Sequence, residues 1–280
     1  MLWQVKVLTQ AALAAMPLGE HLNHQLQRMN AIRRGPRVEA SRLDEIRGSM
    51  EYLSRFTQLK GAKVVEVGTG WDALPTLFLS QAGASIVTYD HVRHLRHRSL
   101  MHSAKFIGLE VDDDPQTALK ALRIDYRAPA DATATGLPDS SVDVFYSYAV
   151  LEHVPPEVIH GLIKEARRVL RPGGLFYGLV GLHDHYNGFD RKVSKVNFLR
   201  YPEWLWRPLV KNAISYHNRL RERDFLDILK GYQAEIVDFR GTTDPADRDR
   251  LDTMKIAKEF QNYSKDELAV TRTEIIARWA

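Results

Sequence analysis

The fold is decided by a short stretch in the first third of the chain, which reads Val64-Val65-Glu66-Val67-Gly68-Thr69-Gly70. Its first four residues include the β-branched run of a short buried strand. The glycines let the backbone turn sharply, and a helical stretch follows over residues 72–81. A strand that turns directly into a helix leaves the positive end of that helix beside the turn. We therefore expect an α/β fold with a ligand site at this turn.

Further strands follow at regular intervals along the chain. The pattern predicts them at residues 85–89, 123–126, 142–148 and 175–180, with helices between them. Pro155-Pro156 opens the last of these helices, and Pro172-Gly173-Gly174 closes it. Strand and helix alternating at this spacing predict a parallel sheet that is covered on both faces.

Both ends of the chain add to this core. Residues 1–60 have helical spacing and are expected to form an N-terminal helical cap, and residues 61–280 the main domain. An aromatic and basic insertion is expected at about 183–223, after the fifth strand. Beyond it the pattern predicts a helix at 224–230, a strand at 234–239, a helix at 251–263 and a strand near 271–277.

Composition excludes several kinds of chemistry. The 280 residues include 39 basic and 35 acidic side chains, a net charge of +4, and no cysteine. Disulfides, thiolate metal sites, cysteine-ligated iron–sulfur clusters and a catalytic thiol are therefore impossible. No run approaches the ~20 apolar residues of a membrane span. Residues 7–18 resemble a signal peptide only weakly, because Thr9 and Gln10 interrupt the apolar run, and we expect a cytoplasmic location.

The glycine turn and a later carboxylate suggest the kind of ligand. A purely structural turn would show the same two glycines, and so would a dinucleotide fold. However, Trp71 and Asp72 stand where a dinucleotide fingerprint continues toward its third glycine. Asp90 ends the second strand about 20 residues on, where a carboxylate can accept hydrogen bonds from both hydroxyls of a ribose. A phosphate-free adenosyl ligand needs this turn and this carboxylate but not the third glycine.

Five blocks in order give the chain a family resemblance. It resembles the class I S-adenosylmethionine-dependent methyltransferases, in the small-molecule branch called methyltransferase type 11. The resemblance covers about residues 60–180 and rests on residues 64–70, Asp90, residues 131–144, Tyr148-Ala149-Val150-Leu151-Glu152-His153-Val154 and Arg168-Val169-Leu170-Arg171-Pro172-Gly173-Gly174. It implies a Rossmann-like, mostly parallel seven-stranded sheet of strand order 3-2-1-4-5-7-6, completed by the two late strands.

The resemblance also implies which residues hold S-adenosylmethionine. Glu66 would orient the methionine amino group, Asp90 would hold the ribose hydroxyls, and Asp131 would bond the adenine amino group. Trp71 departs from the usual small residue, and either lines the mouth of the cofactor site or packs in the core. The full set of expected cofactor residues is Glu66, Gly68, Thr69, Gly70, Trp71, Asp90, Asp131, Ala132 and Tyr148.

Histidines are the candidates for catalysis. Transfer of a methyl group to a neutral hydroxyl requires removal of the hydroxyl proton, and histidine suits neutral pH. His153 is the leading base because it follows the fourth strand, although it could instead buttress the site. His183, Asp184 and His185 follow the fifth strand, at the carboxyl edge of the sheet where such folds bind ligands.

Metal binding has two candidate patterns in the sequence. Two histidines that flank Asp184 could hold a divalent metal, but no second acidic group is tied to them by spacing, so we expect no metal. His91, His94 and His97 recur every three residues, with arginines between them that would repel a cation. We interpret these three as the polar face of a helix.

The expected acceptor is a small molecule rather than a nucleic acid. The arginines are scattered in groups at 28–37, 93–98 and 219–223 rather than gathered in one stripe. The block after strand four also lacks the Asn/Asp-Pro-Pro-aromatic sequence of enzymes that methylate base nitrogens. Aromatic residues of the insertion, together with Asn218-Arg219-Leu220-Arg221, resemble a subgroup associated with glycan and polysaccharide biosynthesis.

We therefore predict O-methylation of a hydroxyl on a neutral or anionic sugar or glycan, by in-line displacement with a histidine base; S-adenosylhomocysteine is the product. The alternatives are methylation of another small metabolite, such as a quinone, phenol or lipid, and a non-catalytic protein that binds the cofactor. The oligomeric state is not indicated by the sequence.

Overall fold

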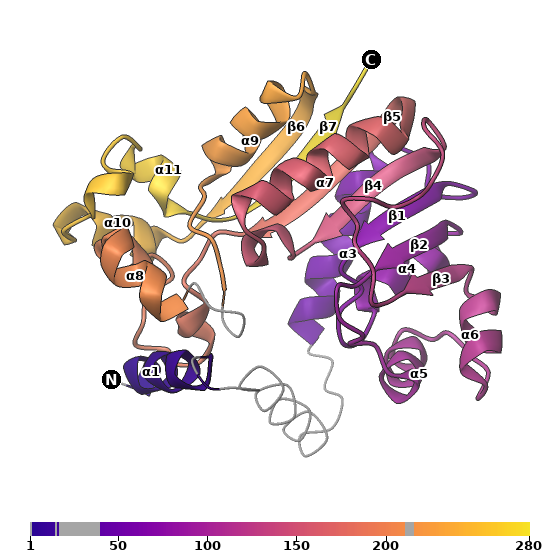
Figure 1. Cartoon of the computed structure of the whole chain (residues 1–280), viewed down its shortest axis with the longest axis horizontal. Coiled ribbons are helices and arrows are strands. Elements are labelled where there is room, and N and C mark those ends of the chain that lie inside the picture. Colours follow the sequence, from indigo (N-terminus) through magenta and orange to yellow (C-terminus); the bar gives the residue numbers. More distant parts are fainter. Residues whose placement is uncertain (1, 15, 17–39, 211–215) are drawn as a thin grey trace.

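The computed structural model describes residues 2–14, 16, 40–210 and 216–280. Its centre is a seven-stranded sheet in the order β3-β2-β1-β4-β5-β7-β6, which confirms the predicted fold and strand order (Figure 1). β1 to β5 pair in parallel, and β7 runs antiparallel to β5 and β6. The strands are β1 (Lys63–Val67), β2 (Ser85–Tyr89), β3 (Ile124–Arg127), β4 (Val142–Tyr148), β5 (Leu170–Gly181), β6 (Glu235–Thr243) and β7 (Val270–Arg278).

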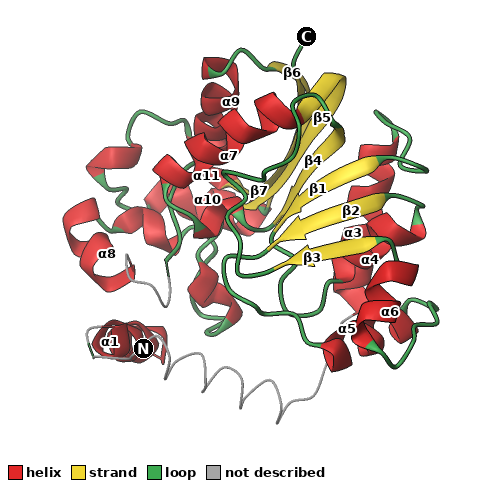
Figure 2. Ribbon diagram, turned by 45° about the vertical axis from the view of Figure 1, so that its right-hand side comes forward, coloured by secondary structure: helices red, strands yellow, loops and turns green. Residues whose placement is uncertain are grey.

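Helices cover the sheet, and further helices lie beyond it on one side (Figure 2). The α-helices are α1 (Leu2–Ala14), α3 (Ala40–Ser54), α4 (Leu74–Gln81), α5 (His97–Phe106), α6 (Pro115–Ala121), α7 (Pro156–Val169), α8 (Glu203–Val210), α9 (Glu222–Gly231), α10 (Pro245–Thr253) and α11 (Lys265–Ala269). Short 3₁₀ turns are η1 (Leu151–His153), η2 (His185–Gly188), η3 (Asn197–Arg200) and η4 (Lys258–Phe260).

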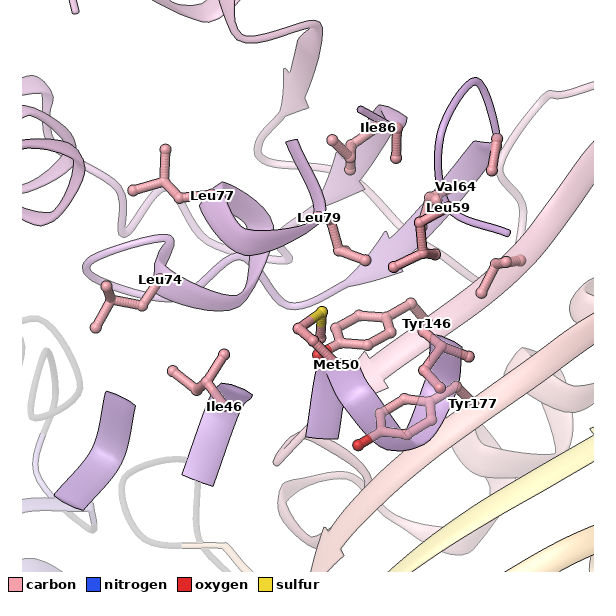
Figure 3. Close-up of a cluster of buried hydrophobic side chains, with 14 of the residues drawn as sticks. Ile46, Met50, Leu59, Val64, Leu74, Leu77, Leu79, Ile86, Tyr146 and Tyr177 are labelled. Atoms are coloured by element: carbon pink, nitrogen blue, oxygen red, sulfur yellow. The ribbon is translucent and has the colours of Figure 1, made fainter. Parts of the chain in front are cut away.

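Side chains that alternate along the strands build a core on each face of the sheet. One face packs against α3 and α4, with Ile46, Met50, Leu74, Leu77 and the stacked rings of Tyr146 and Tyr177 among the buried residues (Figure 3). The other face packs against α7 and α9. Burying one such Ile or Leu side chain contributes about 1.5–3 kcal/mol, so the two cores fix the strand ends that carry the site.

The insertion after β5 forms a third apolar cluster with the N-terminal helix. α1 packs against α8, and the ring of Trp3 lies 5.8 Å from the rings of both Tyr186 and Tyr201. Phe198 and Trp206 are buried in the same cluster. The expected helical cap thus has α1 on the insertion and α3 on the sheet, whereas residues 17–39 lie outside the described residues.

Two local predictions are wrong. The helix expected at 251–263 is replaced by α10, η4 and α11. Asp244 caps α10 by accepting a hydrogen bond from the backbone of Ala246 (3.0 Å), and Ser264 caps α11 in the same way through Glu267 (3.2 Å). His91 and His94 lie in the loop before α5 rather than on a helix, because α5 begins only at His97.

Candidate functional site

The glycine turn after β1 adopts the backbone that the sequence indicated. Gly68 and Gly70 have positive φ angles of 83° and 72°, a region that favours glycine. A Cβ atom at Gly68 would lie 2.4 Å from Cγ2 of Val150, so the turn passes directly against the loop after β4. Thr69 is buried, and its hydroxyl bonds to that of Thr88. The side chain of Thr69 therefore fixes the turn from inside.

Glu66 on β1 presents a buried acceptor without a partner. Its Oε2 accepts a hydrogen bond from the hydroxyl of Thr76 (2.6 Å), whereas Oε1 has no partner among the described residues. Burial raises the pKa of Glu66 to about 7. A buried carboxylate oxygen without a donor is costly unless a ligand supplies one, and an ammonium group would do so. This geometry fits the expected role toward the methionine amino group.

Asp90 lies just beyond β2, beside the glycine turn. It is 4% exposed, and burial raises its pKa. One carboxylate oxygen accepts from the hydroxyl of Tyr126 (3.0 Å), and the other accepts from the backbone of Gly70 (3.4 Å). The carboxylate is thus held against the turn, where a ribose diol bound along Gly68–Gly70 would reach it.

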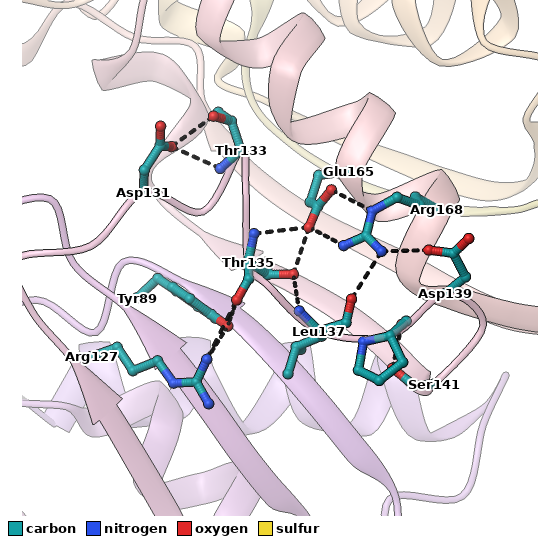
Figure 4. A network of polar contacts seen from close by, with 11 residues as sticks. Tyr89, Arg127, Asp131, Thr133, Thr135, Leu137, Asp139, Ser141, Glu165 and Arg168 are labelled. Carbon is teal, nitrogen blue, oxygen red and sulfur yellow. Dashed lines mark hydrogen bonds and ion pairs between the residues drawn. The ribbon is translucent and has the colours of Figure 1, made fainter.

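Asp131 and Ala132 lie on the loop between β3 and β4. Asp131 accepts hydrogen bonds from the backbone (2.8 Å) and hydroxyl (2.7 Å) of Thr133, and Ala132 is buried. The loop is anchored to α7 because Glu165 accepts from the backbone of Thr135 (2.8 Å) and from Arg168 (2.9 Å) (Figure 4). The hydrogen bond from Arg168 holds the pKa of Glu165 down at about 2. This network positions the expected adenine-binding residues.

Trp71 and Tyr148 lie at the border of the cofactor site. Trp71 is 39% exposed, with its ring 4.8 Å from that of His94, which places it at the rim of the turn rather than in the core. The hydroxyl of Tyr148 donates to Glu45 on α3 (3.0 Å), and Glu45 also pairs with Arg272 (3.0 Å). Tyr148 thus ties α3 to the end of β4.

Four histidines gather where the loops after β4 and β5 meet. The ring of His185 lies 4.8 Å from those of His153 and His217 and 4.9 Å from that of His183. Burial lowers the pKa of His185 to about 2, and the pKa values of His153 and His183 are also lowered, chiefly by desolvation. His153, His183 and His185 are therefore neutral imidazoles at neutral pH.

Two members of this region were missed in the sequence. His217 reaches the cluster because Asn218 binds the loop after β4, donating to the carbonyl oxygens of Glu152 (2.7 Å) and Leu151 (2.7 Å). Glu152 is buried, and its Oε1 accepts from the backbone of Gly181 (2.9 Å). Glu152 could have been noticed because it is a charged residue within a mostly apolar block, between Leu151 and His153. No local pattern marks His217.

Asp184 is not part of the histidine cluster. Its carboxylate accepts hydrogen bonds from the backbone of Tyr186 (2.9 Å) and the side chain of Asn197 (2.9 Å). Both partners belong to the insertion, so Asp184 shapes the loop that carries His183 and His185. Among the described residues, the carboxylate of Asp184 is therefore engaged by the insertion and not by the two flanking histidines.

The arginine groups are largely occupied within the protein. Arg93 donates to the carbonyl of Ala128, and Arg221 is fully buried, donating to the carbonyl of Leu182 (2.8 Å). Arg219 binds the carbonyl of Phe198 (3.3 Å) and also pairs with Glu203. Arg28, Arg33, Arg34 and Arg37 lie outside the described residues. Arg93, Arg219 and Arg221 are thus engaged within the protein.

Two cavities flank the sheet. One of about 550 Å³ lies at the amino ends of β1 to β4, between Lys63 and Lys120, on the edge opposite the glycine turn. The other, of about 430 Å³, lies beside the histidine cluster and has His217 in its wall. Its lining includes aromatic and charged side chains, among them Trp206, Tyr216, Arg219, Glu259 and Tyr263. His217 is the residue that this cavity shares with the histidine cluster.

The glycine turn, the orphaned Glu66 oxygen and the Asp90 carboxylate, at the carboxyl edge of this sheet, are the features of a class I S-adenosylmethionine-dependent methyltransferase. Residues 65–178 match a family model described as a methyltransferase domain, so the chain contains such a domain and its cofactor is S-adenosylmethionine. No helix among the described residues is long and apolar enough to cross a membrane.

Relatives of known name share this domain. The chain is similar to the ubiquinone biosynthesis O-methyltransferase of Xylella fastidiosa (strain M23), with 29% identity over 143 residues, 51% of this chain and 50% of that protein. The protein of the same name from Xanthomonas euvesicatoria is 25% identical over 143 residues, 51% of this chain and 52% of that protein. The chain thus spans about half the length of the curated relatives it matches, and their names do not support the glycan expectation.

Solved structures agree on the fold. Magnesium protoporphyrin IX methyltransferase of Synechocystis, with bound S-adenosylhomocysteine, aligns with a TM-score of 0.54 and 13% identity over 91% of this chain and 94% of its own. An S-adenosylmethionine-dependent methyltransferase of Methanosarcina mazei aligns with a TM-score of 0.51 and 17% identity over 81% and 96%. At these identities the likeness establishes the fold alone.

Proposed function

We propose that this protein is an O-methyltransferase that methylates a hydroxyl group of a small aromatic molecule, a phenol or quinol. The observation that carries the proposal is the cluster of imidazoles on the loops after β4 and β5, at the same carboxyl edge of the sheet as the glycine turn. S-adenosylmethionine supplies an electrophilic methyl group on a sulfonium centre. The chain must therefore bind the acceptor in line, exclude water and accept or release the hydroxyl proton.

The orientation of the histidines would let them assist removal of the hydroxyl proton. The Nδ1 atom of His153 faces the carbonyl oxygen of Tyr216 (3.3 Å), and Nδ1 of His185 faces the carbonyl oxygen of His183 (3.0 Å). A carbonyl can only accept, so each Nδ1 carries the hydrogen and each Nε2 keeps its lone pair. Assistance to proton removal by groups so placed contributes about 10²–10⁴-fold to the rate.

Two observations favour an aromatic acceptor. The cavity of about 430 Å³ has Trp206, Phe260 and Tyr263 in its wall, which suits a ring. The relatives that share the methyltransferase domain are named ubiquinone biosynthesis O-methyltransferases, and a quinone is a ring compound. A sugar hydroxyl is the second candidate, because carboxylates such as Glu157 and Glu259 alternate with these rings.

The proposal is tested by the release of S-adenosylhomocysteine from the purified protein. We expect turnover with ortho-hydroxylated phenols or quinols and none with sugars or nucleotide sugars. His153→Ala should lower kcat at least a hundredfold and leave the Kd of S-adenosylmethionine unchanged. His160→Ala, on α7 outside the cluster, is the matched control and should keep full turnover.

Three outcomes would contradict the proposal. Turnover with sugars and not with phenols or quinols would show that the acceptor is a sugar. Full activity in both His153→Ala and His185→Ala would remove the histidines from the chemistry. Cofactor binding with no product from either acceptor class would favour a non-catalytic binding protein.

A further inference from the structure

Three polar side chains of the histidine cluster have the arrangement of a metal site. They are Glu152 and His153 on the turn after β4, and His185 on the turn after β5. One ligand atom from each residue lies within 4.8 Å of the ligand atoms of the other two. Bonds of about 2.0–2.2 Å to one ion place its ligands about 3–4 Å apart, so small side-chain rotations would close the set.

Each of the three is anchored through the atom that a metal would not use. Oε1 of Glu152 accepts from the backbone of Gly181, and the Nδ1 atoms of His153 and His185 donate to carbonyl oxygens. This leaves Oε2 of Glu152 and the two Nε2 atoms as the atoms that would bind an ion. Backbone contacts that fix the ring and tautomer of a histidine are typical of metal ligands.

The carboxylate gives an independent sign that something is missing from the site. Glu152 is only 3% exposed, and its Oε2 has no partner in the part of the chain that the structure describes. Leaving a buried carboxylate oxygen without a donor or cation is unfavourable. A Cβ at residue 181 would lie 2.7 Å from Oε1, so Gly181 is the residue type that lets the carboxylate sit there.

The charge of the cluster suits a divalent cation. Lys195 and Glu45 act on His183 at the margin of the cluster. Once a cation is bound, Glu152 supplies a deprotonated carboxylate and His153 and His185 supply neutral ring nitrogens. The ligand set then has a charge of −1.

We infer that Glu152, His153 and His185 bind a divalent transition-metal ion, such as Zn²⁺, Mn²⁺ or Fe²⁺, that holds the acceptor hydroxyl. Two nitrogen ligands and one oxygen ligand favour these ions over Ca²⁺ or Mg²⁺, which prefer oxygen. Three protein ligands leave coordination positions open, as in catalytic sites. The site differs from the aspartate-centred one considered in the sequence, because Asp184 is engaged elsewhere.

The role of the ion rests on the proposed function. With their Nε2 lone pairs on the ion, His153 and His185 would assist proton removal through the ion and not as free bases. A hydroxyl bound to the ion would have a lowered pKa and would lose its proton to solvent. The acceptor oxygen then forms its bond to the methyl carbon as the carbon–sulfur bond breaks, with that electron pair remaining on sulfur. Sulfur loses its positive charge and the oxygen its negative charge, so the step is balanced without an oxidant or reductant.

Metal binding is tested without reference to turnover. The full-length protein is freed of metal by chelation and dialysis and titrated with Co²⁺, followed by visible absorption, and with Zn²⁺, followed by calorimetry. We expect one ion per chain with bound-metal absorption from Co²⁺. Glu152→Gln and His185→Ala should each weaken binding at least a hundredfold. His160→Ala, which removes an imidazole outside the cluster, should leave the affinity unchanged.

A folding control accompanies these variants, namely an unchanged Kd for S-adenosylmethionine and a cooperative thermal transition. The absence of stoichiometric binding, or equal affinity in the wild type and both ligand variants, would overturn the metal site. If the protein still methylates a phenol after chelation of the metal, the proposed role of the ion is overturned and the proposed function stays intact. A bound ion with no methylated acceptor would instead retain the site and reject the function.

Discussion

The cofactor side and the acceptor side of this site are built differently. Glu66, Gly68 and Asp90 lie at or just beyond the ends of the adjacent strands β1 and β2, and their partners lie on β2, β3, the glycine turn and the helix α4 that follows it. His153, His185 and His217 come from three separate loops, and Asn218 of the insertion binds the loop that carries His153. The difference predicts that variants on the first side alter cofactor affinity, whereas variants on the second alter turnover or metal binding.

The largest effect on the cofactor side is expected at Asp90. Its carboxylate would bind two ribose hydroxyls, and hydrogen bonds to a charged group contribute about 1.5–3 kcal/mol each. Asp90→Ala should therefore raise the Kd of S-adenosylmethionine about a hundredfold in calorimetry. Tyr126→Phe, which removes only the hydroxyl that donates to Asp90, is the milder control. Unchanged affinity in Asp90→Ala would refute the division between the two sides.

Glu66 should make cofactor affinity depend on pH. With a pKa of about 7, its carboxylate is mostly protonated at pH 5.5 and half ionised at pH 7.0. If the ionised form binds the methionine ammonium, affinity should rise about fifteenfold between these pH values, where the amine stays protonated. Glu66→Gln should bind S-adenosylmethionine weakly at every pH and lose the rise in affinity between pH 5.5 and 7.0. Calorimetry at several pH values measures both.

The same residue should carry a cost in stability. The folded pKa is raised from 4.5, so the free energy of unfolding falls as pH rises from about 4.5 to 7. Glu66→Gln removes this penalty and should be more stable than the wild type at pH 8, by at most about 3 kcal/mol, and equally stable at pH 4. Denaturant unfolding without cofactor measures this, and a less stable variant at pH 8 would count against the buried charge.

Glu165 should have a smaller effect with the opposite sign. Its pKa is lowered to about 2, so its contribution to stability is present above pH 4.5 and is lost as pH falls toward 2. Glu165→Gln should destabilise the protein by roughly 1–2 kcal/mol at pH 7, with the difference shrinking in acid. Because Glu165 anchors the loop of Asp131 and Ala132, we also expect the Kd for the cofactor to rise about threefold.

The cofactor side of the site could be predicted from the sequence better than the acceptor side. The positions of the strands and residues such as Gly68 and Asp90 are marked by local patterns, because a strand end and its carboxylate are neighbours in the chain. The sheet order came with the family resemblance, and β5 begins at Leu170, before the predicted 175–180. The late helix at 251–263 was misplaced because Asp244-Pro245 and Ser264 start two shorter helices. Glu152 and His217 join the site through contacts across the fold, which spacing along the chain does not reveal.

The two exposed tryptophans provide the finest test of the division. Trp71 is 39% exposed at the rim of the glycine turn, and Trp204 is 76% exposed on α8. A rim residue loses only part of its surface to a ligand, so Trp71→Ala should raise the Kd of S-adenosylmethionine about threefold. Trp204→Ala removes the same side chain from the acceptor side and should leave that Kd unchanged. Equal effects of the two variants in a calorimetric titration would mean that the insertion contributes to cofactor binding, and the two sides would then have to be treated as one site.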